Sequence, residues 1–280
     1  MRLVSLTCSN TEIVSSLGYA AHLVGVDDHS DYPADVVARL PRVGPDLTID
    51  PEKVAALEPD LVLASLTVPG HEHVVASLKA RGLPLLVTEP ISVEDVYADV
   101  RLIAECLLEF PDGIEALERA ERVIADMRRE LAPVLEPTRR PKILVEWWPR
   151  PVIVPGRDSW VNQLLEVAGA QNPFASRDVR STPIEHQEAL LEPPDAVVIA
   201  WCGVHVDKYR PSKVYERAAW QDTPALKERR VYRVPEAFLG RPSPRLVCGA
   251  AAFRSIAADV LEGRSAPPDA LPRGIDVTDV

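Results

Sequence analysis

The sequence is poor in cysteine, in aromatic residues and in long apolar runs, and each shortage limits the kind of protein it can encode. Its 280 residues include four scattered cysteines and no CxxC pair. That spacing argues against a zinc site and is typical of buried, reduced thiols, although Cys8 and Cys202 fall at the ends of predicted strands. Since no run of about eighteen apolar residues occurs, we expect no transmembrane helix.

Basic residues are outnumbered as well. The chain has 31 Lys and Arg against 42 Asp and Glu, which gives a formal net charge of −11. Nucleic acids and anionic membranes need a basic face, so neither is an expected partner. The apolar segment at residues 2–6 is too short for a signal peptide and is predicted to be a strand. We therefore expect either a cytoplasmic protein or a chain recorded without its leader.

Catalytic and metal-binding signatures are missing. Ser9 lies outside any Gly-x-Ser-x-Gly motif, and neither a phosphate loop nor a dinucleotide glycine fingerprint is present. His71 and His73 are two residues apart, which points their side chains to different sides of a helix. We therefore predict a protein with no enzymatic activity, no metal site and no prosthetic cofactor.

The sequence does contain one α/β unit written twice. Residues 52–64 and 188–200 each read as a short helix that begins with Glu, a Pro-Asp or Pro-Pro-Asp turn, and an apolar strand. Residues 10–18 and 162–169 form a second matching pair, an amphipathic helix that ends in Gly. The repetition predicts two similar lobes, with a small-molecule site in the cleft between them.

Strands and helices alternate in both halves, which predicts α/β lobes with parallel sheets covered on both faces. The predicted strands are 3–6, 22–26, 61–64, 85–88, 142–147, 196–201 and 231–234. The predicted helices are 10–17, 51–57, 71–80, 93–109 with Ser92 as N-cap, 114–134, 160–168, 187–191, 223–228 and 244–261. The predicted organisation is an N-terminal lobe (1–110), a long inter-lobe helix (111–137), a C-terminal lobe (138–262) and an irregular tail (263–280).

Ligands of parallel sheets bind beyond the carboxyl ends of the strands. The candidate ligand-binding residues at these ends are Ser9, Asn10, Tyr32, Ser65, Trp147, Trp148, Trp201, His205, Phe238 and Arg241. Aromatic residues make up only 5% of the chain, yet five lie in this set, and large flat rings suit a large flat ligand. Ser9 or Asn10 also reads as a helix N-cap, and His205 either ligates a metal ion within a bound ligand or is an exposed loop residue.

Several of these segments resemble a known family. Matching segments are 2–6, 9–14, 17–18, 24–27, 31–33, 42–44, 51–54, 58–64, 146–149, 155–160 and 243–246. Together they resemble the class III, or helical-backbone, substrate-binding proteins of ABC importers, and most of all the vitamin B12-binding group. The resemblance implies two Rossmann-like lobes joined by one rigid helix, with a corrinoid, haem or siderophore held between them.

The resemblance also implies a glutamate on each lobe that docks onto an ABC permease. The first is Glu52; the second position holds Gln187, with Glu185 and Glu188 beside it. It further implies an extracytoplasmic, monomeric protein that captures cobalamin or a related corrinoid. Two alternatives stay open, namely a ferric siderophore or haem-binding protein with Arg150, Arg157 and Arg241 near the ligand, and a cytoplasmic corrinoid-handling protein.

Overall fold

A computed structural model describes residues 1–135 and 137–277. Contacts divide them into two compact units, which are considered one at a time. The N-terminal unit comprises residues 1–128 and 242–244, and the C-terminal unit comprises residues 129–241 and 245–277 apart from residue 136. Residue 136 of the predicted inter-lobe segment and residues 278–280 of the predicted tail lie outside the described residues.

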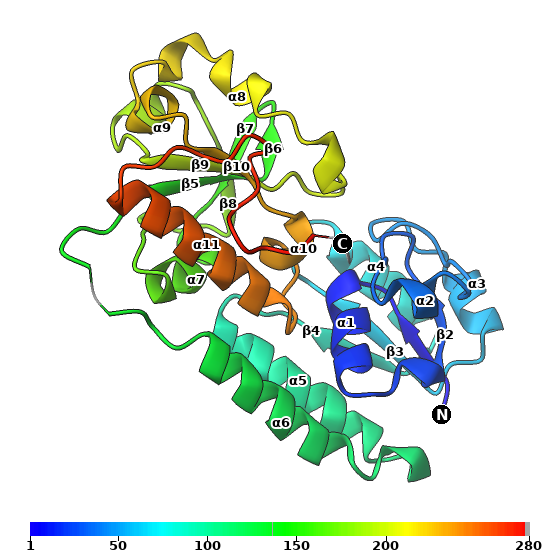
Figure 1. Ribbon diagram of the computed structural model, residues 1–280. Helices are drawn as coiled ribbons and strands as arrows, with labels where there is room; N and C mark the ends of the chain where they lie inside the picture. Colours follow the sequence, from blue (N-terminus) through cyan, green and yellow to red (C-terminus); the bar gives the residue numbers. More distant parts are fainter. Residues whose placement is uncertain (136, 278–280) are drawn as a thin grey trace. The chain divides into compact units, whose positions relative to one another are not determined.

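The N-terminal unit contains a four-stranded parallel sheet in the order β2-β1-β3-β4 (Figure 1). Its strands are β1 (Leu3–Ser5), β2 (Leu23–Val26), β3 (Leu61–Ser65) and β4 (Leu85–Thr88). Its helices are α1 (Cys8–Ser16), α2 (Ala34–Val37), α3 (Pro51–Ala56), α4 (His71–Ala80), α5 (Val93–Leu107) and most of α6 (Ala116–Glu130), with 3-10 turns η1 (Ala20–His22) and η2 (Pro111–Gly113). The predicted parallel sheet is confirmed.

Both faces of this sheet are buried because successive strand residues point to opposite sides. Val4 and Val62 pack on one face with Val54 of α3 and Leu78 of α4. Residues on the alternate positions, such as Leu63, are also fully buried. This pattern explains why the strands read as continuous apolar runs rather than as alternating ones.

One helix start follows the predicted capping chemistry and another departs from it. Ser92 is the N-cap of α5, as predicted, and forms a capping box with Asp95. By contrast, α1 begins at Cys8, so the expectation that Ser9 or Asn10 caps this helix is wrong. Asn10 lies inside the helix because its amide is used elsewhere, donating to the carbonyl of Ala64 at 3.1 Å.

The C-terminal unit combines two small sheets. A parallel sheet in the order β10-β9-β5 contains β5 (Ile143–Glu146), β9 (Ala196–Ile199) and β10 (Val231–Arg233), and it confirms the predicted strands. An antiparallel sheet in the order β6-β7-β8 contains β6 (Trp148–Pro149), β7 (Val152–Pro155) and β8 (Ser181–Ile184). The second sheet was not predicted, because its strands are short, contain proline and carry little apolar periodicity.

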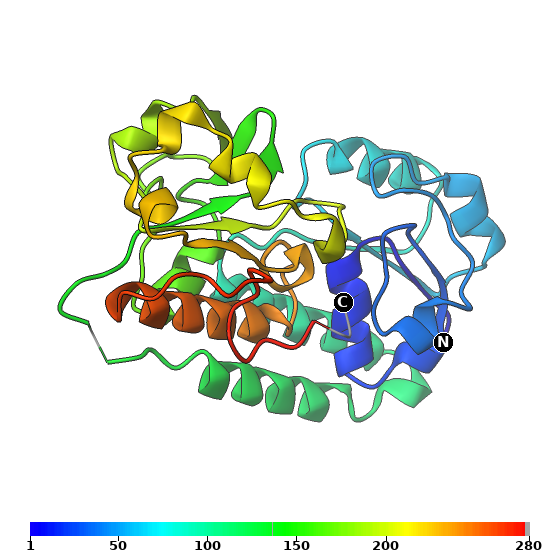
Figure 2. The ribbon, with the colours of Figure 1, turned by 45° about the horizontal axis from the view of Figure 1, so that its top comes forward.

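The helices of the C-terminal unit are mostly short. They are α7 (Val161–Val167), α8 (Ser212–Tyr215), α9 (Pro224–Lys227), α10 (Glu236–Leu239) and α11 (Leu246–Leu261), with 3-10 turns η3 (Glu188–Leu190), η4 (Val206–Lys208) and η5 (Ala218–Trp220). The helix predicted at 187–191 is therefore only the 3-10 turn η3. The long helix α11 packs against α7 below the parallel sheet, as both ribbon views show (Figures 1 and 2).

The tail beyond Gly263 has no helix or strand within residues 264–277, but it is tied to the C-terminal unit. The backbone amide of Ala266 donates to the carbonyl of Arg229, and that of Arg233 donates to the carbonyl of Ala270. Arg264 and Arg273 both form ion pairs with the buried carboxylate of Asp259 on α11. In the described residues no helix is long and apolar enough to span a bilayer, and all four cysteines are free thiols.

Candidate functional site

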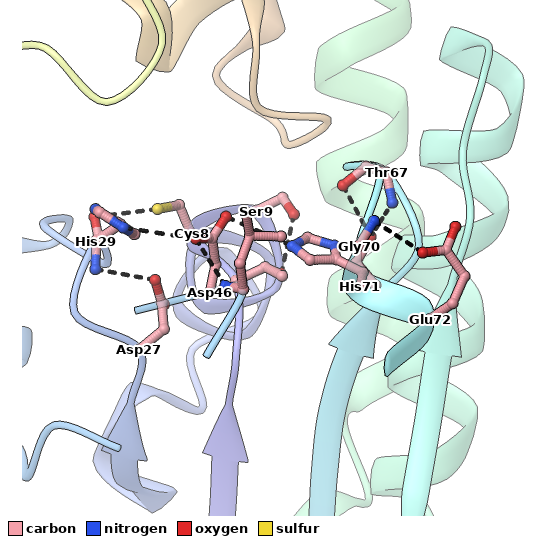
Figure 3. A network of polar contacts seen from close by, with 12 residues as sticks. Cys8, Ser9, Asp27, His29, Asp46, Thr67, Gly70, His71 and Glu72 are labelled. Carbon is pink, nitrogen blue, oxygen red and sulfur yellow. Dashed lines mark hydrogen bonds and ion pairs between the residues drawn. The ribbon is translucent and has the colours of Figure 1, made fainter. Parts of the chain in front are cut away.

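A polar network lies at the carboxyl ends of the strands in the N-terminal unit (Figure 3). At its centre Asp46 lies between two imidazoles. Its Oδ1 is 3.6 Å from Nε2 of His29, and its Oδ2 is 3.5 Å from Nε2 of His71. We call these three residues the Asp46 site. His71 is only 4% exposed, whereas the side chains of Asp46 and His29 are 29% and 49% exposed, so the site opens toward solvent on one side.

The loop that carries His29 is held by several hydrogen bonds. Asp27 accepts from the hydroxyl of Ser30 at 2.5 Å and from the backbone amide of His29 at 2.9 Å. Arg42 Nη1 donates to the carbonyls of Asp27 and Ser30, each at 2.7 Å. The thiol of Cys8 lies 3.1 Å from the carbonyl of His29, to which it donates. Burial raises the pKa of the Asp27 carboxyl, against the opposing effect of the Ser30 and His29 donors.

His71 is positioned by the turn that opens α4. Gly70 has a φ of +106°, a conformation that favours glycine, and its amide donates to Glu72 Oε2 at 2.8 Å. Figure 3 shows the His71 ring pointing toward Asp46. Both ring nitrogens are buried, and neither has a well-formed hydrogen bond within the described residues. The neighbouring His71 imidazole is the main cause that lowers the pKa of Asp46 below its usual range.

The Asp46 site is suited to hydrogen bonding and charge recognition. In the part of the chain that the structure describes, no group of three or more His, Cys, Asp or Glu side chains is arranged to hold a metal ion. An ionised Asp accepts hydrogen bonds only, whereas a neutral imidazole has one donor and one acceptor nitrogen. The site therefore offers a ligand one anionic acceptor with mixed polar groups beside it.

The predicted ligand residues of the N-terminal unit lie near this network. Ser9, Asn10 and Ser65 are buried, and each is engaged by the protein itself. Ser9 Oγ is 3.3 Å from Thr7 Oγ1, and Ser65 Oγ donates to Thr67 Oγ1 at 3.1 Å. Tyr32 is half-buried.

The C-terminal unit contains a pocket of about 890 Å³, within the size range typical of small-molecule sites. It is lined by Pro149, Arg150, His186, Gln187, Trp201, Arg210, Lys213, Glu216, Arg217, Ala218 and Ala219. Four of these side chains are basic and one is acidic. The lining comes from the β6–β7 turn, the segment before η3, the end of β9 and the region around α8.

A buried ion pair lies beside this pocket. Arg217 makes two hydrogen bonds to the Glu146 carboxylate, one of them 3.0 Å between Nη2 and Oε1. Trp201 Nε1 donates to the same carboxylate at 2.9 Å. Arg217 also lies over the Trp220 ring, 4.5 Å from its centroid. Since Glu146 is fully buried, these contacts fix both Arg217 and the Trp201 ring at the carboxyl ends of β5 and β9.

Of the predicted ligand residues in the C-terminal unit, Trp201 alone lines the pocket. Trp147 is half-buried, Trp148 is 41% exposed, and Phe238 is 4% exposed. His205 is exposed and its Nδ1 accepts from the amide of Asp207, whereas Arg241 forms an ion pair with Glu236 at 3.3 Å.

Sequence reasoning missed much of both sites. His29, Asp46, His71, Arg210, Lys213 and Arg217 were not among the candidate residues. His29 follows a strand, which was the only local signal. His71 begins α4, and the others lie in loops or short helices that no motif marks.

The proposed docking glutamates differ in exposure. Glu52 is exposed at the first turn of α3 and pairs with Arg81. Glu185 is exposed, whereas Glu188 is half-buried and paired with Arg177. Gln187 lines the pocket.

Comparison with known proteins gives consistent matches along most of the chain. The family model described as "Periplasmic binding protein" matches residues 3–237. The uncharacterized ABC transporter substrate-binding lipoprotein YvrC of Bacillus subtilis is 30% identical over 260 residues, covering 89% of this chain and 77% of that protein. The vitamin B12-binding protein of Vibrio cholerae is 24% identical over 246 residues, covering 87% of this chain and 84% of that protein.

Solved structures share the fold. The apo periplasmic heme-binding protein RhuT from Roseiflexus sp. RS-1 has a TM-score of 0.76 and 24% identity, covering 94% of this chain and 98% of that one. The vitamin B12-binding protein BtuF of Vibrio cholerae has a TM-score of 0.72 and 21% identity, covering 93% and 98%. The expected α/β fold with a parallel sheet in each of two lobes is confirmed.

Proposed function

The chain belongs to the periplasmic binding protein family, in its class III group, and on that premise we propose that it captures cobalamin or a related corrinoid for an ABC importer. Proteins of this family bind their ligands without turning them over, and we propose the same for this chain. Relatives named as vitamin B12-binding proteins, each 24% identical to it, support the choice of a corrinoid.

The basic, tryptophan-bearing pocket of the C-terminal unit is the observation that carries this proposal. Four cationic side chains line it in a protein whose net charge is −11. Arg217 is paired with the buried Glu146 and Lys213 with Glu216, so in the part of the chain that the structure describes Arg150 and Arg210 are the lining cations without a carboxylate partner. Cobalamin carries a phosphodiester anion on its nucleotide loop, which basic groups attract and hydrogen-bond. Trp201 adds a flat apolar surface of the kind that ring-shaped ligands contact.

Haem is the second candidate, and the same pocket favours it for the same reason. Its propionates are anions, and several solved structures with this fold are named as heme-binding proteins. A ferric siderophore with carboxylate groups would meet the pocket in the same way. The basic pocket therefore supports an anion-bearing ligand, and the sequence relatives support the corrinoid.

Transport by an ABC importer requires a permease to which the binding protein docks, and a location outside the cytoplasm. We propose that Glu52 docks on a permease, since it is exposed on the outer helix α3, with Glu185 and Glu188 as the corresponding positions of the C-terminal unit. We propose an extracytoplasmic location and a monomeric state on the same family basis. If the protein acts in the cytoplasm instead, it handles corrinoids without an importer, and fractionation of cells that express the native gene distinguishes the two.

Binding is tested by titrating the purified protein with cyanocobalamin, haemin and a ferric siderophore, followed by visible absorbance and calorimetry. We expect submicromolar affinity for cyanocobalamin. Replacing Arg150 by Ala removes one pocket cation and is expected to weaken binding about 10- to 100-fold, because a charged hydrogen bond contributes about 1.5–3 kcal/mol.

Lys208→Ala is the matched control, since Lys208 is exposed but does not line the pocket, and its affinity should equal that of the wild type. Trp201→Ala tests the aromatic contribution, since this tryptophan lines the pocket, and it is expected to weaken binding. No heat and no spectral change with any corrinoid would refute the ligand assignment.

A further inference from the structure

We infer that the Asp46 site makes this protein prefer ligands whose periphery carries carboxamides over ligands whose periphery carries carboxylates. The inference rests on the proposed function and narrows it, because corrinoids such as cobalamin are edged with carboxamides whereas haem carries two carboxylates. It concerns the N-terminal unit alone and uses none of the residues of the basic pocket.

The first step is the charge of the site. Within the described residues Asp46 forms ion pairs with His29 and His71 only, and no lysine or arginine is paired with it. The site therefore presents a carboxylate without a permanent counter-charge, and its side chain is 29% exposed to an incoming ligand. A second carboxylate brought to this place would be repelled.

The second step is the unsatisfied state of His71. This ring is 4% exposed, points toward Asp46, and has two buried nitrogens without a well-formed hydrogen bond in the described residues. Its Nε2 is 3.5 Å from Asp46 Oδ2, at the outer limit of hydrogen bonding. Buried polar atoms left without partners are rare in folded proteins and call for an explanation. The carboxylate of Asp46 is the polar group that this buried ring faces, so we infer that His71 holds Asp46 in place while the exposed side of the carboxylate meets the ligand.

The third step matches the chemistry of the two sides. A carboxamide donates through its NH2 group and accepts through its carbonyl oxygen. It can therefore donate to Asp46 while it accepts from an imidazole N–H of His29, whose side chain is 49% exposed. A carboxylate has acceptor atoms only, so it cannot donate a hydrogen bond to Asp46, and its negative charge is repelled by that of Asp46. The complementarity is thus to a neutral amide edge.

The fourth step is rigidity. Asp27, Ser30 and Arg42 hold the loop of His29 by hydrogen bonds of 2.5–2.9 Å, and the Gly70 turn fixes the start of α4 at His71. Groups fixed before binding lose little freedom when the ligand arrives. The site is consequently able to discriminate between an amide and an acid of the same shape.

The experiment compares cyanocobalamin with its monocarboxylic acids, in which one peripheral carboxamide is hydrolysed to a carboxylate and the rest of the molecule is unchanged. The readout is the ratio of the two dissociation constants, measured by calorimetry at pH 7.5 for each separated monoacid. For wild-type protein we expect at least one monoacid to bind about 10- to 100-fold more weakly than the amide, the range that one charged hydrogen bond supports.

In Asp46→Asn the carboxylate becomes a neutral amide of the same shape, and we expect that ratio to fall to about 1–3. Haemin affinity should rise in the same variant, because the repulsion of its propionates is removed. Asp35→Asn on α2 removes an exposed carboxylate elsewhere, and His73→Gln replaces an exposed histidine two residues beyond His71, so both should keep the wild-type ratio. His29→Gln, at a half-exposed position, provides a second variant of the site should Asp46→Asn unfold, and it too should lower the ratio.

The outcomes separate the two proposals. Equal ratios in wild type, Asp46→Asn and His29→Gln overturn this inference and leave corrinoid capture standing. If wild-type protein binds every monoacid as tightly as cyanocobalamin, the inference is likewise overturned and corrinoid capture still stands. Wild-type protein that binds haemin tightly and no corrinoid overturns both, and so does protein that binds neither.

Discussion

The buried carboxylates of the C-terminal unit are paired with cations, whereas two of those in the N-terminal unit are not. In the C-terminal unit Glu146 is paired with Arg217, and Asp195 is paired with Arg139. Asp259 has a third such arrangement, with Arg264 and Arg273 and a hydrogen bond of 3.0 Å from the hydroxyl of Tyr232. In each case burial of charge is offset by an opposite charge.

In the N-terminal unit, Asp27 is held by a hydroxyl and a backbone amide. Asp99 on α5 is 8% exposed and has no hydrogen bond or ion pair in the described residues. Burial, with a smaller contribution from the charge of Asp95, raises the pKa of Asp99 to about 7. The comparison teaches that the buried carboxylates of the C-terminal unit are neutralised by ion pairs, whereas in the N-terminal unit Asp27 is held by uncharged donors and Asp99 has no partner among the described residues.

Breaking the pairing in the C-terminal unit should have the largest effect. Glu146→Gln leaves Arg217 buried without its counter-charge, and we expect a loss of about 3–5 kcal/mol in the free energy of unfolding. Urea denaturation followed by tryptophan fluorescence measures it. Glu216→Gln, an exposed partner of Lys213, should change stability by less than about 1 kcal/mol. Similar losses in both variants would show that the buried pair is no more important than a surface one.

Removing the unpaired charge of the N-terminal unit should have the opposite sign. Because the pKa of Asp99 is raised in the folded state, the folded protein holds this proton more tightly than the unfolded chain, and its stability falls as pH rises from about 4 to about 7. Asp99→Asn is therefore expected to stabilise the protein by about 2 kcal/mol at pH 8 and to give little gain at pH 4. Denaturation at both pH values measures the difference, and a gain independent of pH would contradict the assignment to this carboxyl.

One tyrosine from each unit tests the same difference between the units, with a smaller expected change in the free energy of unfolding. Tyr232→Phe removes one hydrogen bond from the buried Asp259, and we expect a loss of about 1 kcal/mol in the free energy of unfolding. Tyr97→Phe in the N-terminal unit alters a buried tyrosine whose ring lies under Arg128, at 5.2 Å from the centroid, and it should be nearly neutral. Thermal denaturation of the two variants side by side measures the loss of stability in each. Equal losses would show that burial of the hydroxyl, and not the hydrogen bond to Asp259, determines the loss.

The strands could be predicted from sequence to within one or two residues, because apolar runs such as Leu61–Ser65 are buried on both faces and bounded by turn residues. The start of α1 could not, since the Asn10 side chain bonds to a strand 54 residues away. The β6-β7-β8 sheet could not be predicted from sequence either, because its short strands are stabilised by pairing with one another rather than by their own composition.

The sites were predictable only where a side chain directly follows a strand. Trp201 comes two residues after β9 and was found. The Asp46 site joins positions 29, 46 and 71, whose spacing matches no motif, and it forms because two loops and the start of α4 meet at one edge of the sheet. Arg217 likewise reaches Glu146 across 71 residues. Contacts of this kind depend on tertiary structure, which local periodicity does not encode.

The irregular tail has a practical consequence for anyone who trims this protein. A gene cut after Gly263 would look harmless, since no helix or strand follows. It would nevertheless delete both arginines that neutralise Asp259 and leave that carboxylate, buried in α11, with the hydroxyl of Tyr232. Shortened versions designed for crystallisation or sensor fusions should therefore keep the chain through Arg273, or replace Asp259 by Asn at the same time.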